Sequence, residues 1–168
     1  MRDTLDRLIR TPDDLAEAIR GRSEAALVRR PDWTAWAAKE IVCHLRDIEE
    51  LFLLRLEVIA ALDEPVIPAA GLGGRALNLT ADGRPAAPER WAEDRQYLRH
   101  DAVAALATFR ARRGDVLSHL AALTPDQWAR GGVHTRRGRI TVADIAAEMI
   151  AHDEHHAAQL RRALNGER

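Results

Sequence analysis

The sequence has a single cysteine, Cys43, so an intrachain disulfide and a CxxC metal site are both excluded. It also has little net charge, a formal −1 at pH 7, and its arginines are scattered among acidic residues. This balance argues against a nucleic-acid partner. Neither an apolar run of about eighteen residues nor the apolar stretch of a signal peptide occurs, so we expect no membrane span. These absences together predict a cytoplasmic protein.

β-Branched residues are also sparse, and no stretch alternates between apolar and polar residues as a strand would. Alanine, leucine, arginine and glutamate dominate instead, which indicates helical periods. The 168 residues, 46% of them hydrophobic, suffice for one domain spanning residues 1–168 with a substantial core. We therefore predict an all-α fold.

Start and stop signals divide the chain into four main helical regions. Thr11 followed by Pro12 predicts the start of the first, and Pro65 ends a second that begins near Trp36. A third runs up to Leu123, and a fourth from Thr141 to about residue 165. Between the second and third, residues 63–88 are rich in Gly and Pro and predict a long loop, whereas the glycine-rich residues 131–140 predict a turn or small hairpin.

Three of the seven histidines lie in the short segment HDEHH, and two of them point inward. With successive residues about 100° apart, His152 and His156 share a face with apolar residues of the last helix. In the second helix His44 lies in the middle of an apolar stripe, and Arg46, Glu49, Glu50 and Glu57 fall on the opposite side. His155 lies at the edge of its helix face.

A lone inward histidine is usually a core residue that makes one hydrogen bond. Two neutral imidazoles one turn apart on a buried face are costly unless something binds both of them. A divalent metal ion does so at about 2.0–2.1 Å, and a third ligand from His44 would leave open positions for water or substrate. The sequence thus predicts a metal site made by His44, His152 and His156.

Two segments carry a resemblance to a known family, the DinB/YfiT-like superfamily of metal-dependent proteins. The first is WAAKEIVCHLRDIEELFLLRL, which contains His44, and the second is PDQWARGGVHTRRGRITVADIAAEMIAHDEHHAAQLRRAL. The resemblance implies a four-helix bundle of up-down-down-up topology, a homodimer, and zinc or nickel bound by these three histidines. By the ordinary affinity order and by availability, iron is a further option. It also implies a small-molecule substrate, which in characterised relatives is a low-molecular-weight thiol joined to an electrophile.

Two carboxylates are candidate catalytic bases beside the predicted metal. Asp47 lies one turn after His44, and Glu148 lies one turn before His152. Either could instead orient an imidazole through its second ring nitrogen. Arg55 lies in the His44 stripe but three turns further on, and we expect it to pair with Asp144 or Glu148.

Three functions therefore stay open at this point. The first is an S-transferase for low-molecular-weight thiols, the second a metal-dependent hydrolase, and the third a non-catalytic dimer in which the metal only stabilises the bundle. An open three-histidine site favours an enzyme over a purely structural role. We expect the four tryptophans to be packing anchors, and Leu53 and Ile150 to face a dimer partner.

Overall fold

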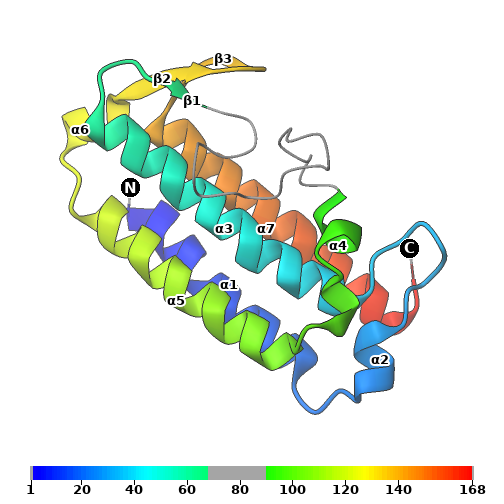
Figure 1. Ribbon diagram of the computed structural model, residues 1–168. Coiled ribbons are helices and arrows are strands. Elements are labelled where there is room, and N and C mark those ends of the chain that lie inside the picture. The colour runs from blue at the N-terminus through cyan, green and yellow to red at the C-terminus, as the bar shows by residue number, and fades with distance from the viewer. Residues whose placement is uncertain (1, 68–89, 168) are drawn as a thin grey trace.

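The computed structural model describes residues 2–67 and 90–167, and four long helices make up most of it (Figure 1). These are α1 (Arg2–Ile19), α3 (Ala38–Ala61), α5 (Ala102–Ala121) and α7 (Val142–Asn165). Each of α1 and α3 packs against both α5 and α7. Helices α1 and α7 run in one direction and α3 and α5 in the other, so the predicted up-down-down-up four-helix bundle is confirmed.

Shorter elements decorate the two ends of the bundle. The helical ones are α2 (Glu24–Val28), α4 (Trp91–Asp94), the 3-10 turn η2 (Tyr97–Arg99) and α6 (Pro125–Ala129). The strands are β1 (Val66–Ile67), β2 (Gly131–His134) and β3 (Gly138–Thr141), with β1 parallel and β3 antiparallel to β2. The small hairpin is confirmed, β1 was not predicted, and most of the expected loop lies outside the described residues.

Two adjacent glycines allow the three strands to come together. A Cβ on Gly131 would lie 2.3 Å from the carbonyl oxygen of Ile140, and one on Gly132 would lie 2.4 Å from that of Pro65. Any larger residue would push the strands apart. The tight sheet fixes the hairpin across one end of α3 and α7 (Figure 1).

The predicted start of the first helix at Thr11 is wrong, because α1 begins at Arg2 and continues through Pro12. Proline has no N–H for the carbonyl of Leu8, one turn earlier. That oxygen instead accepts a hydrogen bond of 2.9 Å from Nη1 of Arg113. A partner on a neighbouring helix thus replaces the missing backbone donor.

Arg113 joins all four long helices in the middle of the core. Its guanidinium donates to Glu49 of α3 at 2.6 and 2.8 Å and to Asp153 of α7 at 2.7 Å, and all three side chains are buried. The sequence placed Glu49 on the side of its helix away from the apolar stripe. That side is not exposed, because α3 lies between α7 and α5 and is covered on both faces.

The third helical region is not continuous. Gln96 adopts a left-handed conformation, with φ of 52°, and separates α4 from the 3-10 turn. Asp101 then starts α5 by accepting a hydrogen bond of 2.7 Å from the backbone N–H of Ala104. The break puts Tyr97 in the core against α3.

Apolar side chains expected to be outside are mostly covered. Ile150 is 7% exposed, and Leu53 is partly buried against the core. Trp91 and Trp128 are buried anchors, as expected, whereas Trp33 is 86% exposed and anchors nothing. The homodimer therefore stays a prediction.

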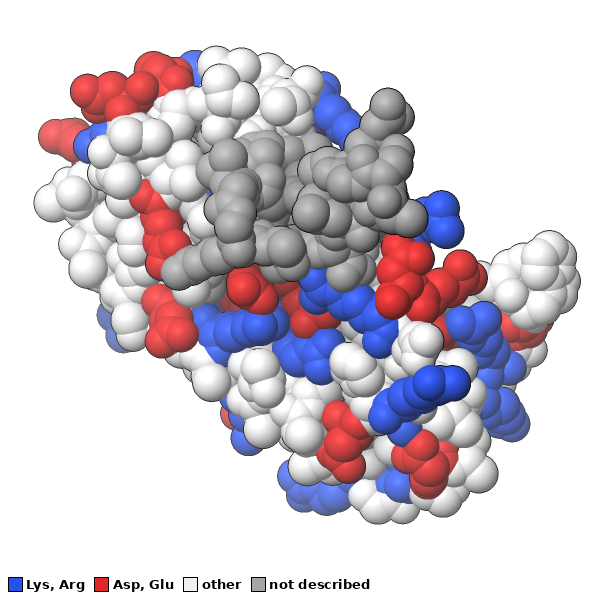
Figure 2. All heavy atoms as spheres, in the orientation of Figure 1, with Lys and Arg blue, Asp and Glu red and all other residues white. Residues whose placement is uncertain are grey.

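Charged side chains of both signs are interspersed over the face of the molecule shown in Figure 2, with no large region of one sign. This agrees with the formal net charge of −1. None of the described helices has an apolar stretch of the length needed to cross a bilayer.

Candidate metal centre

Helices α3 and α7 bring three histidines together. One nitrogen from each of His44, His152 and His156 lies within 4.8 Å of the other two. The Nε2 atoms of His44 and His152 are 3.2 Å apart, and the ring centroids of His152 and His156 are 4.3 Å apart. Two nitrogens that each lie about 2.0–2.1 Å from one ion are at most about 4.2 Å apart, a limit that the Nε2 atoms of His44 and His152 meet. With a small adjustment of the side chains, the three histidines could hold one divalent metal.

These imidazoles are neutral, which is the form that binds metal. Burial, followed by the charge of His156, lowers the pKa of His44 to about 3. Burial, with the neighbouring histidines, lowers that of His152 to about 2. Each neutral imidazole has one N–H donor and one bare nitrogen, and a metal ion is a partner that can bind the bare nitrogens of all three rings at once.

The second ring nitrogen of His156 supports this assignment. Nδ1 of His156 lies 2.7 Å from Oε1 of Gln159, an arrangement that places the proton on Nδ1 and leaves Nε2 to bind metal. Nδ1 of His44 and of His152 is buried and has no hydrogen-bond partner among the described residues. The sequence reasoning missed Gln159, although its position three residues after His156 puts it on the same face.

Aromatic rings support the histidines from the side. The Trp36 ring is stacked on His156 with centroids 6.0 Å apart, and it lies 4.9 Å from the His44 ring. Phe52 meets His152 edge to face at 5.9 Å. Trp36 was predicted to be a packing anchor between helix ends, and it is in fact part of the wall of the site.

The three histidines form one end of a cavity of about 420 Å³, a volume within the usual range for small-molecule sites. The rest of the lining is apolar next to the histidines and charged further away. It consists of Trp36, Ile48, Leu51, Phe52, Arg55, His134, Arg136, Arg137 and Glu148.

The charged end is built by α3, α7 and the β2–β3 hairpin. Glu148 accepts a hydrogen bond of 2.5 Å from Arg137, and one of its oxygens lies 3.8 Å from Nη1 of Arg55. The predicted ion pair between Arg55 and Glu148 is therefore confirmed. The hairpin residues His134, Arg136 and Arg137 line the same cavity because the sheet holds the hairpin over it.

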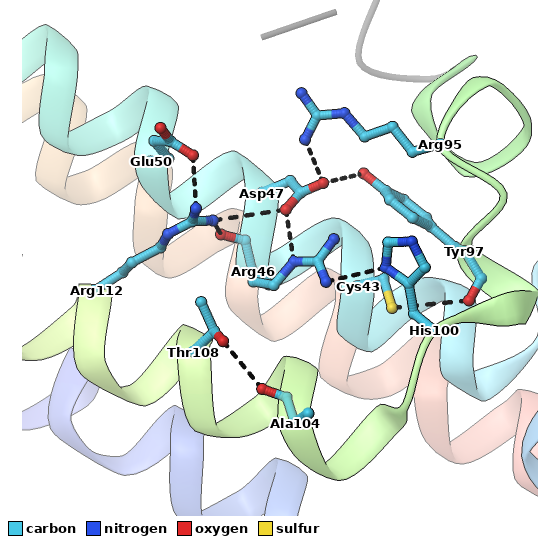
Figure 3. Close-up of polar contacts among 10 residues, drawn as sticks. All are labelled: Cys43, Arg46, Asp47, Glu50, Arg95, Tyr97, His100, Ala104, Thr108 and Arg112. Atoms are coloured by element: carbon cyan, nitrogen blue, oxygen red, sulfur yellow. Dashed lines mark hydrogen bonds and ion pairs between the residues drawn. The ribbon is translucent and has the colours of Figure 1, made fainter. Parts of the chain in front are cut away.

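Of the two candidate bases, Glu148 lines the cavity and Asp47 does not. Figure 3 shows Asp47 on another side of α3, where it accepts hydrogen bonds from Arg46 at 2.6 Å, from Tyr97 at 2.8 Å and from Arg95. Burial alone would raise the pKa of Asp47, but the bond and charge of Arg46, together with Arg95, lower it. Asp47 therefore ties α3 to the segment before α5 and lies outside the group of three histidines.

Three further residues near the ligands lie outside the centre. His155 is exposed, and Asp153 points to Arg113. Cys43 is buried, and burial raises the pKa of its thiol to about 11, so it supplies no thiolate near neutral pH.

Comparison with known families places most of the chain in one of them. The family model of the DinB superfamily matches residues 7–160. Among solved structures, YfiT from Bacillus subtilis is similar, with a TM-score of 0.79 and 21% sequence identity over 96% of this chain and 84% of YfiT. YfiT is described as a probable metal-dependent hydrolase with an unusual four-helix bundle topology. No curated protein matches the sequence.

Proposed function

This chain belongs to the DinB superfamily, and on that premise we propose that it is an enzyme that uses a divalent metal ion to hydrolyse a small molecule. One observation carries the proposal: three neutral histidines place their ligand atoms within 4.8 Å of one another at the end of a cavity of about 420 Å³. YfiT, described as a probable metal-dependent hydrolase, supports the choice of reaction.

A divalent ion held by three imidazoles supplies Lewis acidity and lowers the pKa of a water molecule toward 7. Imidazole donors suit zinc, nickel and iron, and we propose zinc or nickel for this site. The apolar wall formed by Trp36 and Phe52 limits the access of bulk water and holds the uncharged part of a substrate against the histidines.

Glu148 is the proposed general base. It begins the turn that leads to His152, and it is the one carboxylate among the residues that line the described cavity. Its hydrogen bond from Arg137 fixes the carboxylate, leaving one oxygen near Arg55 and the cavity. A carboxylate in this position accepts a proton from the attacking water and returns it to the leaving group.

Transfer of a low-molecular-weight thiol to an electrophile is the second candidate. The same open positions suit a thiol, and the buried Cys43 cannot supply one, so the thiol would have to come from the substrate. A homodimer is also a proposal, and light scattering tests it against the 18.7 kDa of one chain.

The test uses protein loaded with zinc or nickel and two panels. One panel holds esters and amides, and the other pairs bacillithiol, mycothiol, glutathione or coenzyme A with a generic electrophile. We expect hydrolysis that is lost in His44→Ala, falls about 10²-fold or more in Glu148→Gln, and persists in the control His155→Ala. Thiol-dependent turnover without hydrolysis would favour the transferase, and inactivity in both panels with metal bound would favour the non-catalytic dimer.

A further inference from the structure

The cavity has two chemically different ends. Its histidine end is rimmed by apolar and aromatic side chains, whereas the other end is lined by Arg55, Arg136, Arg137 and His134. Glu148, one turn before His152 and in contact with Arg55 and Arg137, lies where the two ends meet. A catalytic metal needs only its ligands, a base and space for the reacting group. The second end is therefore not accounted for by the metal centre.

Positive charge is in excess at this end. Three guanidinium groups line it, against the single carboxylate of Glu148, which already contacts Arg55 and Arg137. This excess affects the pKa values of neighbouring groups. Burial is the largest cause that lowers the pKa of His134, and the charges of Arg55 and Arg137 lower it further. Burial likewise lowers the pKa of Arg55, the charge of Glu148 raises it, and the charge of Arg137 lowers it again.

His134 adds a neutral donor to the three cations. Its Nδ1 accepts a hydrogen bond of 3.1 Å from the backbone N–H of Arg136, so the ring proton is on Nε2. Guanidinium and imidazole N–H groups around one cavity are the donors that proteins use for carboxylates and phosphates.

The two ends are close enough for one small molecule to reach both. Cζ of Arg55 lies 5.7 Å from the centroid of the Phe52 ring, and that centroid lies 5.9 Å from the centroid of the His152 ring. The guanidinium can be no further from the imidazole than these two distances together. We infer that the substrate carries a carboxylate or phosphate group, which binds at the arginine end while the reacting bond lies at the histidine end.

A simpler account is that the arginines serve only to hold Glu148. One carboxylate does not need three guanidinium groups, and Arg136 has no carboxylate partner among the described residues. Arg55 is also only 5% exposed, so that its charge, beside that of Glu148, lies in a buried part of the cavity where charges are poorly screened by water. A substrate anion would therefore be bound more strongly here than at a solvated surface.

The inference rests on the proposed metal centre, so one experiment measures both metal binding and the preference for a carboxylate probe. Protein loaded with cobalt(II) is titrated with 6-mercaptohexanoate and with 6-mercapto-1-hexanol, which differ in the terminal carboxylate, and the visible absorption of cobalt reports binding. We expect the carboxylate to bind about tenfold more tightly, a difference of about 1.4 kcal/mol. Inorganic phosphate, added as a competitor, should weaken binding of the carboxylate probe but not of the alcohol.

Variants of the three arginines test whether the preference for the carboxylate probe arises at the arginine end of the cavity. In Arg55→Gln, Arg136→Gln and Arg137→Gln the ratio of the two affinities should fall severalfold, and Arg55→Lys should retain more of it than Arg55→Gln. The matched control is Arg139→Gln, because Arg139 lies on the same hairpin, pairs with Glu64 and does not line the cavity. Arg136 and Arg137 are exposed, so their variants are expected to fold.

The metal centre and the anionic group of the substrate are contradicted by different results. Loss of the cobalt spectrum in the wild type would contradict the metal centre and the inference with it. Normal cobalt binding without a carboxylate preference, whether both probes bind equally or neither binds, would overturn the inference and leave the metal centre intact. The same holds for a preference that survives in all three glutamine variants.

Discussion

Replacing Arg113 with methionine should destabilise the bundle more than any exposed substitution. The change removes the donor to Glu49, to Asp153 and to the carbonyl of Leu8, all inside the core. Breaking a buried ion pair on one side costs about 3–5 kcal/mol, because the remaining charge stays buried without its partner. Domains of this size have about 5–15 kcal/mol of stability in total, so the loss would be a large share of it.

Urea unfolding followed by circular dichroism measures this loss directly. Arg110→Met is the matched control, because Arg110 lies one turn earlier on α5 and its partner Asp13 is exposed. An exposed pair contributes at most about 1 kcal/mol. The triple variant Arg113→Met, Glu49→Gln, Asp153→Asn should regain part of the stability, since no buried charge is left without a partner.

Pro12 offers a second perturbation of the same network. In Pro12→Ala the backbone N–H at position 12 can bond the carbonyl of Leu8, so the cost of Arg113→Met should be smaller in that background. A cost below about 1 kcal/mol for Arg113→Met alone would refute the reasoning, as would a triple variant less stable than the single one.

Two further predictions concern charge. Unfolded His44 and His152 take up protons below the ordinary pKa of 6.5, whereas in the fold they do so only near 3 and 2. The metal-free protein should therefore lose up to about 1.4 kcal/mol per histidine and pH unit as the pH falls below 6.5, and urea unfolding of His44→Gln should show a smaller pH dependence. Asp47→Asn should cost about 3 kcal/mol, because Arg46, Arg95 and Arg112 lose the carboxylate they share, yet leave the metal content of the protein unchanged. Release of metal from that variant would place Asp47 in the site.

Helical periodicity was enough to predict the direction of the three histidines. His44 lies in an apolar stripe and the other two are one turn apart, so each faces the interior in any packing of amphipathic helices. Periodicity does not say which neighbour a face meets. Asp47 lies at the edge of the histidine stripe, yet its partners come from α5 and from the segment before it.

The surroundings of the other residues depend on contacts between segments that are far apart in the sequence. Helical periodicity predicts that Glu49 faces solvent, but the packing of α5 against α3 places Arg113 beside it in the core. The arginine end of the cavity depends on a three-stranded sheet. Its strand β1 has only two residues, too few to show the alternation typical of a strand. The need for Gly131 and Gly132 follows from their close approach to Ile140 and Pro65, which are distant in sequence or on another strand. Arg136 and Arg137, which lie in a predicted turn of the sequence, therefore line the cavity in the fold.

Metal content per chain tests the central claim most directly. Wild-type protein, His152→Ala and His155→Ala are incubated with zinc or nickel, freed of excess metal and analysed by inductively coupled plasma mass spectrometry. His155 is the matched control, because it is an exposed imidazole next to His156 and outside the three-histidine group. The account predicts about one ion per chain in the wild type and in His155→Ala, and almost none in His152→Ala. Equal metal in the wild type and His152→Ala, or none in the wild type, would contradict it.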